Sequence, residues 1–114
     1  MKRVLVVDDE PVMRKLIGCL LRGRYLIDEA EDGEKALTKA SREQYDCVIT
    51  DVQMPRMSGL HLLGEIKRRR PQTAVIVMSA LGEAYASAAM AGGASSFLAK
   101  PFPGDALRSA LQCV

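Results

Sequence analysis

Four apolar runs in this sequence each end in residues that could carry out chemistry. The runs are followed by Asp8 and Asp9, by Asp51, by Ser79 and by Lys100. Charge that develops on a transferring phosphoryl group is stabilised by cations and hydrogen-bond donors. Carboxylates that hold a metal ion, together with a hydroxyl and an ammonium group, therefore suit phosphoryl transfer. One of the carboxylates could also be the nucleophile and form an aspartyl phosphate.

The three carboxylates would need a counter-charge if the fold brings them together. Two like charges ~4 Å apart repel by about 4 kcal/mol at an effective dielectric constant near 20, so a proton or a cation must relieve the repulsion. Sites with only oxygen ligands select hard cations, which favours Mg²⁺ over zinc. Asp8, Asp9 and Asp51 are therefore candidate magnesium ligands. Taken singly, each polar residue also has a structural explanation, as a helix cap, a turn residue or a solvated side chain.

Strands and helices alternate along the chain and would position these side chains. Short aliphatic and β-branched runs predict strands, and apolar residues at helical spacing predict the helices between them. The expected strands are residues 4–7, 25–30, 47–50, 74–78 and 95–99. The expected helices follow Pro11, Asp32 and Ser58, span residues 83–91, and close the chain with apolar positions from Ala106 to Val114. This alternation predicts an open α/β sheet of parallel strands with right-handed crossovers and helices on both faces.

Composition narrows the classes of function. The 114 residues are 48% apolar, enough for a core, and a net charge of +2 argues against a nucleic-acid or membrane surface. No run approaches the ~18 apolar residues of a membrane span, and no signal peptide is seen, so a cytoplasmic location is expected. Cys19 and Cys47 lie in apolar runs and are interpreted as buried thiols rather than metal ligands. The basic run at residues 67–70 complements the negative end of a helix dipole.

Five segments, in order, resemble the receiver domains of two-component response regulators. They are VLVVDDE (4–10), AEDGEKAL (30–37), DVQMPRMSG (51–59), MSA (78–80) and FLAKPF (97–102), so the resemblance covers essentially the whole chain. It implies a single receiver (phosphoacceptor) domain over residues 1–114. It also implies a flavodoxin-like, doubly wound fold with a five-stranded parallel sheet in the order 2-1-3-4-5 and five helices. In that order the switch point lies between the first and third strands, where Asp8 and Asp9 would meet Asp51.

The resemblance implies a role for each member of the acidic group. Asp51 matches the phospho-acceptor of the family. Asp9 matches the acid that binds Mg²⁺ directly, and Asp8 matches the acid that holds the ion mainly through water. The backbone carbonyl of Gln53 matches the third protein ligand.

Three further positions match residues that respond to the phosphoryl group. Ser79 matches the hydroxyl residue that closes on a phosphoryl oxygen, and Lys100 matches the lysine that contacts it. Phe97 matches the aromatic switch residue, and it lacks the hydroxyl that a Tyr would bring. The resemblance also implies a cis peptide bond between Lys100 and Pro101. Phosphorylation would then change the face formed by the fourth helix, fifth strand and fifth helix.

The implied function is a phosphorylation-dependent signalling receiver that catalyses only its own phosphorylation and dephosphorylation. A sensor histidine kinase or a phosphotransfer protein would dock on exposed residues of the first helix, such as Met13 and Arg14. An output domain or a downstream protein is a further expected partner. No direct contact with nucleic acid or membrane is expected, and the last two helices lack the dense charge pattern of DNA-binding regulator dimers. His61 is expected on the surface without a catalytic role.

Three other functions are alternatives to a receiver. A phosphohydrolase of the haloacid-dehalogenase type needs a second Asp two residues after the nucleophile, where this chain has Gln53. A Rossmann-type nucleotide-binding domain needs a GxGxxG turn after the first strand, where this chain has Asp8, Asp9, Glu10 and Pro11. A receiver-like interaction module that is never phosphorylated stays open, and a phosphorylation assay separates it from the favoured function.

Overall fold

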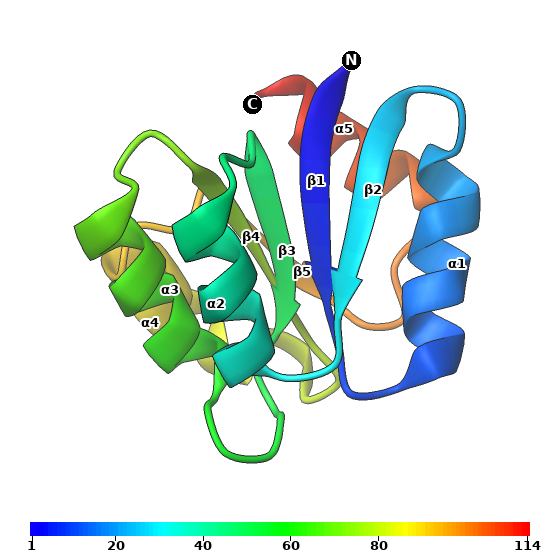
Figure 1. The fold of residues 1–114 in the computed structure, drawn as a ribbon. Coiled ribbons are helices and arrows are strands. Elements are labelled where there is room, and N and C mark those ends of the chain that lie inside the picture. The colour runs from blue at the N-terminus through cyan, green and yellow to red at the C-terminus, as the bar shows by residue number, and fades with distance from the viewer.

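The computed structural model describes residues 1–114 and contains one parallel five-stranded sheet (Figure 1). The strands are β1 (Lys2–Val7), β2 (Tyr25–Ala30), β3 (Cys47–Asp51), β4 (Ala74–Ser79) and β5 (Ser96–Ala99). Their order in the sheet is β2-β1-β3-β4-β5, and every neighbouring pair is parallel. The predicted flavodoxin-like, doubly wound order 2-1-3-4-5 is thus confirmed.

Helices cover both faces of the sheet. They are α1 (Pro11–Leu21), α2 (Gly33–Arg42), α3 (Gly59–Arg69), α4 (Ala86–Ala91) and α5 (Gly104–Gln112), with a short 3₁₀ helix η1 (Gly82–Tyr85) before α4. In Figure 1, α2, α3 and α4 lie on one face, and α1 and α5 lie on the other. No helix is both long enough and apolar enough to cross a lipid bilayer.

The two faces of the sheet carry separate apolar cores, because successive strand residues point to opposite sides. The core under α2, α3 and α4 is built around Leu5, Val48, Leu62, Ile66 and Val75. The core under α1 and α5 is built around Val4, Ile17, Ile49, Ile76 and Leu107. Every residue of β3 is buried, as a central strand requires. Each fully buried aliphatic side chain of these cores stabilises the fold by about 1.5–3 kcal/mol.

Local signals at the helix ends explain where α2 and α3 begin. The Asp32 side chain accepts a hydrogen bond from the Lys35 N–H at 2.8 Å, and Ser58 accepts one from the His61 N–H at 3.1 Å. Such caps stabilise a helix by about 1 kcal/mol each. The helix predicted to follow Ser58 is confirmed, and three basic residues occupy the last turn of α3, where they complement the negative end of the helix dipole as expected.

The structure corrects one expectation about α1 and shows that its buried stripe is narrow. Cys19 was predicted to be buried, but it is exposed, while Cys47 is buried in β3 as predicted. Leu16 is 52% exposed although it lies at helical spacing from the buried residues Ile17 and Leu21. The physical reason is that only a narrow stripe of α1 meets the sheet, so the apolar pattern is wider than the contact. Burial raises the pKa of the Cys47 thiol to about 12, which keeps it protonated at neutral pH.

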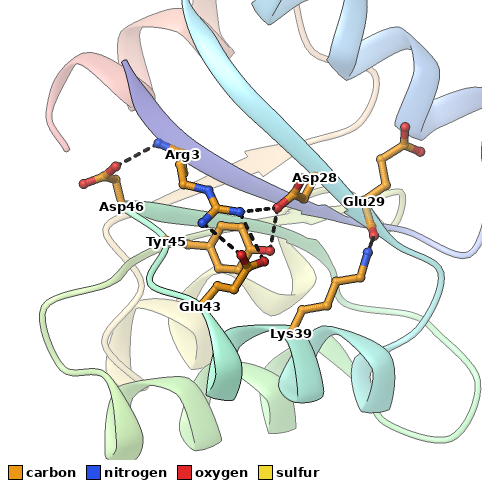
Figure 2. A network of polar contacts seen from close by, with 7 residues as sticks. All are labelled: Arg3, Asp28, Glu29, Lys39, Glu43, Tyr45 and Asp46. Carbon is orange, nitrogen blue, oxygen red and sulfur yellow. Dashed lines mark hydrogen bonds and ion pairs between the residues drawn. The ribbon is translucent and has the colours of Figure 1, made fainter.

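A polar network on the α2 face joins the beginning of β1 to β2 and to the segment before β3 (Figure 2). The Arg3 guanidinium donates to Asp28 at 2.8 Å and to Glu43 at 3.2 Å, and it lies 5.0 Å from the ring centre of Tyr45. The Tyr45 hydroxyl donates to the same oxygen of Asp28 at 2.7 Å. The Asp46 side chain accepts from the Arg3 backbone N–H at 2.8 Å. The sequence pattern did not predict this network, since its members are far apart along the chain.

Candidate functional site

The carboxyl ends of β1 and β3 lie side by side and bring three carboxylates together. Val7 pairs with Thr50 in the parallel register, so the residues that follow, Asp8 and Asp51, leave the sheet at neighbouring points. Carboxylate oxygens of Asp8, Asp9 and Asp51 all lie within 4.8 Å of one another. The convergence expected from the sequence is therefore present in the structure.

Asp8 and Asp9 differ in how their carboxylates are engaged. Asp8 is fully buried; its Oδ1 accepts from the Glu10 N–H at 2.9 Å, and its Oδ2 accepts from the Lys100 ammonium at 2.9 Å. Asp9 is exposed, and no hydrogen bond or ion pair of its carboxylate is found. The Asp9 carboxylate is thus free to bind a cation from solvent, whereas both oxygens of Asp8 already have partners.

Asp51 contains a buried oxygen without a partner. The residue is 6% exposed, and its Oδ2 lies 3.5 Å from the Lys100 ammonium, but its Oδ1 is buried and accepts no hydrogen bond. An unsatisfied buried acceptor costs about 1–3 kcal/mol, more when it is charged. Burial raises the pKa of Asp51 above its ordinary value; Lys100 opposes this effect and Asp8 adds to it. An oxygen-only acidic group with an unpaired, desolvated oxygen fits a hard divalent cation such as Mg²⁺.

Lys100 follows β5 and reaches across to both acidic strand ends. Its side chain is 9% exposed, and its ammonium lies between Asp8 and Asp51. Burial alone would lower the pKa of Lys100, but the hydrogen bond and charge of Asp8, followed by those of Asp51, outweigh burial and raise it. The ammonium is therefore charged at neutral pH. The peptide bond between Lys100 and Pro101 is cis, as predicted.

Ser79 ends β4, which lies beside β3. Asp51 pairs with Met78, so Ser79 lies one position further toward the same edge of the sheet. Its side chain is fully buried, and its oxygen accepts from the Leu81 N–H at 3.1 Å. In this conformation the hydroxyl therefore stabilises the turn after β4, and a contact with a group on Asp51 would require that turn to move.

Gln53 and Phe97 complete the residues singled out from the sequence. Gln53 is exposed and lines a groove of about 480 Å³ together with Asp9 and Tyr85. Phe97 lies in β5, is half-buried, and packs against the core under α2, α3 and α4. His61 is exposed on α3, as expected, and is not among the residues brought together at the carboxyl ends of the strands.

Two residues at this edge were not identified as site residues from the sequence. A Cβ atom on Gly59 would lie 2.0 Å from the backbone carbonyl oxygen of Asp51, so only glycine lets α3 begin this close to the end of β3. Arg14 was expected to be exposed on a docking face, but its side chain is only 15% exposed. It donates from Nη1 to the backbone carbonyl of Asp8 at 2.6 Å and from Nε to Glu29 at 2.9 Å. A glycine directly after a helix cap was a usable signal for Gly59; no local signal pointed to Arg14.

Comparisons with known proteins agree with this geometry. The response regulator receiver domain family matches residues 4–112. The chain is 37% identical over 112 residues to the chemotaxis protein CheY of Bacillus subtilis, covering 96% of this chain and 93% of that protein. It is 40% identical over 110 residues to the transcriptional regulatory protein GlrR of Escherichia coli, covering 95% of this chain and 25% of GlrR. The chain thus spans about a quarter of the length of GlrR.

Solved structures give the same result. The response regulator TrrA of Thermotoga maritima, in complex with Mg²⁺ and BeF, is 40% identical with a TM-score of 0.90, covering 99% of this chain and 98% of that chain. The chemotaxis protein CheY4 of Vibrio cholerae is 30% identical with a TM-score of 0.91, covering 100% and 98%. Strand order, acidic cluster and sequence similarity over nearly the full length point the same way. The chain therefore belongs to the receiver domain family of two-component response regulators, which act in phosphorylation-dependent signalling.

Proposed function

We propose that residues 1–114 form one receiver domain that accepts a phosphoryl group on Asp51 in the presence of Mg²⁺. The observation that carries the proposal is the environment of the Asp51 carboxylate. Its Oδ1 is buried without a partner, Lys100 lies 3.5 Å from its Oδ2, and two further carboxylates lie within 4.8 Å. That environment combines a nucleophilic oxygen, a fixed ammonium and ligands for a hard cation.

In the proposed transfer, an oxygen of Asp51 forms a bond to phosphorus while the bond between phosphorus and the donor breaks. The donor atom is the imidazole nitrogen of a phosphohistidine, or the acyl oxygen of a small acyl phosphate, and it leaves with the electron pair of the broken bond. Lys100 stabilises the charge on the non-bridging oxygens of the group in transfer. Asp9, the carbonyl of Gln53 and, partly through water, Asp8 would hold Mg²⁺, which would supply positive charge to the carboxylates and to the phosphoryl oxygens.

The direct test is phosphorylation by acetyl phosphate, followed by intact-protein mass spectrometry. Wild type should gain one phosphoryl group with Mg²⁺ and none with EDTA, and Asp51→Asn should gain none under either condition. Asp105→Asn is the matched control, because Asp105 is an exposed residue of α5 that pairs with Arg108 and is not a member of the acidic cluster. Equal phosphorylation of Asp51→Asn and wild type would rule out the proposed acceptor. If wild type gains no phosphoryl group from acetyl phosphate or from a phosphorylated histidine kinase, the result would favour an interaction module that is never phosphorylated.

We also propose that phosphorylation shifts the face formed by α4, β5 and α5. The Ser79 hydroxyl would leave the Leu81 N–H and bond a phosphoryl oxygen, which draws the turn after β4 toward Asp51. Phe97 would then rotate into the space behind the turn, and because rotamers are discrete, the change is two-state. Amide NMR with and without beryllofluoride tests this. Shifts confined to the loop after Asp51, with Phe97 and α4 unchanged, would exclude the switch.

The proposed partners are a sensor histidine kinase or phosphotransfer protein upstream and an output domain or protein downstream. Support for an output domain comes from relatives such as GlrR, in which the matched region is a quarter of the protein. The phosphohydrolase alternative lacks support, because Gln53 provides no carboxylate two residues after Asp51 to act as a general acid.

A further inference from the structure

Arg14 lies between the carboxyl ends of β1 and β2, next to the acidic cluster but outside it. Its guanidinium donates to two groups at once: to the backbone carbonyl of Asp8 at 2.6 Å and to the Glu29 carboxylate at 2.9 Å. The side chain is only 15% exposed, so this long cationic residue is largely buried. The planar guanidinium suits two simultaneous acceptors, which an ammonium group on a flexible chain does not match.

The carbonyl that Arg14 binds belongs to the peptide unit joining Asp8 to Asp9. The orientation of this peptide sets the directions in which the two side chains leave the backbone. The same turn is held from its other side by the Asp8 N–H, which donates to the Ala30 carbonyl at 3.2 Å, and by the Glu10 N–H, which donates to Asp8 Oδ1 at 2.9 Å. No side-chain hydrogen bond restrains Asp9 itself, so its direction depends on this peptide unit.

Glu29 is in turn held in place from the opposite side of β2. Lys39 of α2 donates to the Glu29 backbone carbonyl, and Figure 2 shows the Glu29 carboxylate pointing away from the Arg3 network. It points instead to Arg14 and accepts a hydrogen bond from the Arg14 Nε–H. A continuous set of contacts therefore runs from α2 through β2 and Arg14 to the Asp8–Asp9 peptide.

We propose that Arg14 is a positioning residue for the cation site: it orients the Asp8–Asp9 peptide so that both carboxylates face Asp51. The proposal rests on the proposed function, since it concerns the same magnesium site. The direction of the change in Mg²⁺ affinity on removing Arg14 distinguishes positioning from a simple charge effect. A guanidinium near a cation site repels the cation, so removal of its charge alone should strengthen Mg²⁺ binding. Loss of positioning should weaken binding instead, because groups that orient metal ligands typically contribute about 10–100-fold to metal affinity.

The test is a Mg²⁺ titration followed by the amide NMR signals of Asp9 and Glu10 in wild type, Arg14→Gln, Arg14→Lys and Arg68→Gln. Arg68→Gln is the matched control, because it also removes one positive charge and one ion pair. The partner of Arg68 is Glu65, at 2.6 Å on α3, and Glu65 is not one of the three carboxylates of the acidic cluster. Arg14→Gln should raise the Kd for Mg²⁺ about tenfold. Arg14→Lys, which keeps the charge but loses the double donor, should raise it by a smaller factor. Arg68→Gln should leave it within twofold of wild type.

Urea unfolding of each variant separates positioning from general stability. A purely structural role would lower the unfolding midpoint of Arg14→Gln and leave the Kd of the folded protein unchanged, and that result would overturn the inference. Equal or tighter Mg²⁺ binding by Arg14→Gln would overturn it as well. If Arg14→Gln does not fold, Arg14→Lys decides, since an unchanged Kd in that variant contradicts a need for two donors. Failure of wild type to bind Mg²⁺ or take up a phosphoryl group would instead contradict the proposed function.

Discussion

Replacing Asp51 by Asn is expected to stabilise the metal-free protein, although it removes the proposed phospho-acceptor. The Asp51 carboxylate is 6% exposed, and its Oδ1 is buried without a partner. Folding therefore moves this charge from water into a site where it is less stable. The raised pKa of Asp51, with burial as the main cause, also indicates this. An Asn side chain has nearly the same shape and carries no charge to desolvate.

The size of the effect follows from opposing charges and the cost of burial. At an effective dielectric constant near 20, Lys100 at 3.5 Å attracts Asp51 by about 5 kcal/mol. Asp8, within 4.8 Å, repels it by at least about 3.5 kcal/mol, and the solvated carboxylate of Asp9, within the same distance, adds about 1 kcal/mol at the dielectric constant of water. These contributions nearly cancel, which leaves the cost of about 1–3 kcal/mol for a buried oxygen without a partner. Asp51→Asn should therefore raise the free energy of unfolding by about 1–2 kcal/mol, or Tm by about 4–8 °C for a domain of this size.

Thermal unfolding in EDTA and across a Mg²⁺ titration provides the assay. Without metal the variant should unfold at the higher temperature. At ten times its Kd, Mg²⁺ should stabilise wild type by about 1.4 kcal/mol and the variant by less, so that the gap narrows. Asp105→Asn is the control and should change stability by less than about 1 kcal/mol, because Asp105 is an exposed residue. The reasoning would be refuted if Asp51→Asn were less stable than wild type in EDTA, or if Mg²⁺ stabilised both proteins equally.

Three further predictions follow from the same contacts. Asp9→Ala should weaken Mg²⁺ binding more than Asp8→Ala in calorimetric titration, because both oxygens of Asp8 already have protein partners; the reverse order would contradict the assignment of the direct ligand. Gly59→Ala should lower stability by roughly 1–3 kcal/mol in urea unfolding, since its Cβ would lie 2.0 Å from a carbonyl oxygen at the end of β3. Tyr45→Phe should cost about 1 kcal/mol at neutral pH, because the Tyr45 hydroxyl, with Arg3, holds the pKa of Asp28 below its ordinary value. A carboxyl with a lowered folded pKa stabilises the fold above its unfolded pKa, so the deficit of Tyr45→Phe should shrink as the pH falls below about 4; a constant deficit would argue against the linkage.

The strand ends could be predicted because the information is local. An apolar run and the polar residue that follows it are neighbours in sequence, and parallel strands bring their carboxyl ends to one edge of the sheet. Asp8, Asp51 and Lys100 therefore came together as expected. Strand order is not local, and it was correct because of the family resemblance rather than the apolar pattern.

The contacts of α1 could not be predicted, because they depend on how the helix is rotated about its axis. Leu16 and Cys19 satisfy the apolar pattern, yet they face solvent because the sheet covers only a narrow stripe of the helix. Arg14 has the composition of a surface residue, yet its partners lie on β1 and β2. A long side chain can reach several acceptors, and only the tertiary structure selects among them.

The segment after Ser79 is helical as predicted, but its boundaries differ from the prediction. One helix was predicted over residues 83–91, but the structure contains η1 followed by the six-residue α4. Gly82, with φ of 63°, turns the chain in a conformation that other residues rarely adopt, and neither η1 nor α4 begins with a side-chain cap. Within the two helices only Ala89 is buried. A short, uncapped helix with one buried methyl group is weakly attached, so displacement of this segment requires less free energy than displacement of α3, which buries three large apolar residues. If Ser79 moves toward a phosphoryl group, we therefore expect the change to displace α4 rather than α3, which begins beside the Asp51 carbonyl.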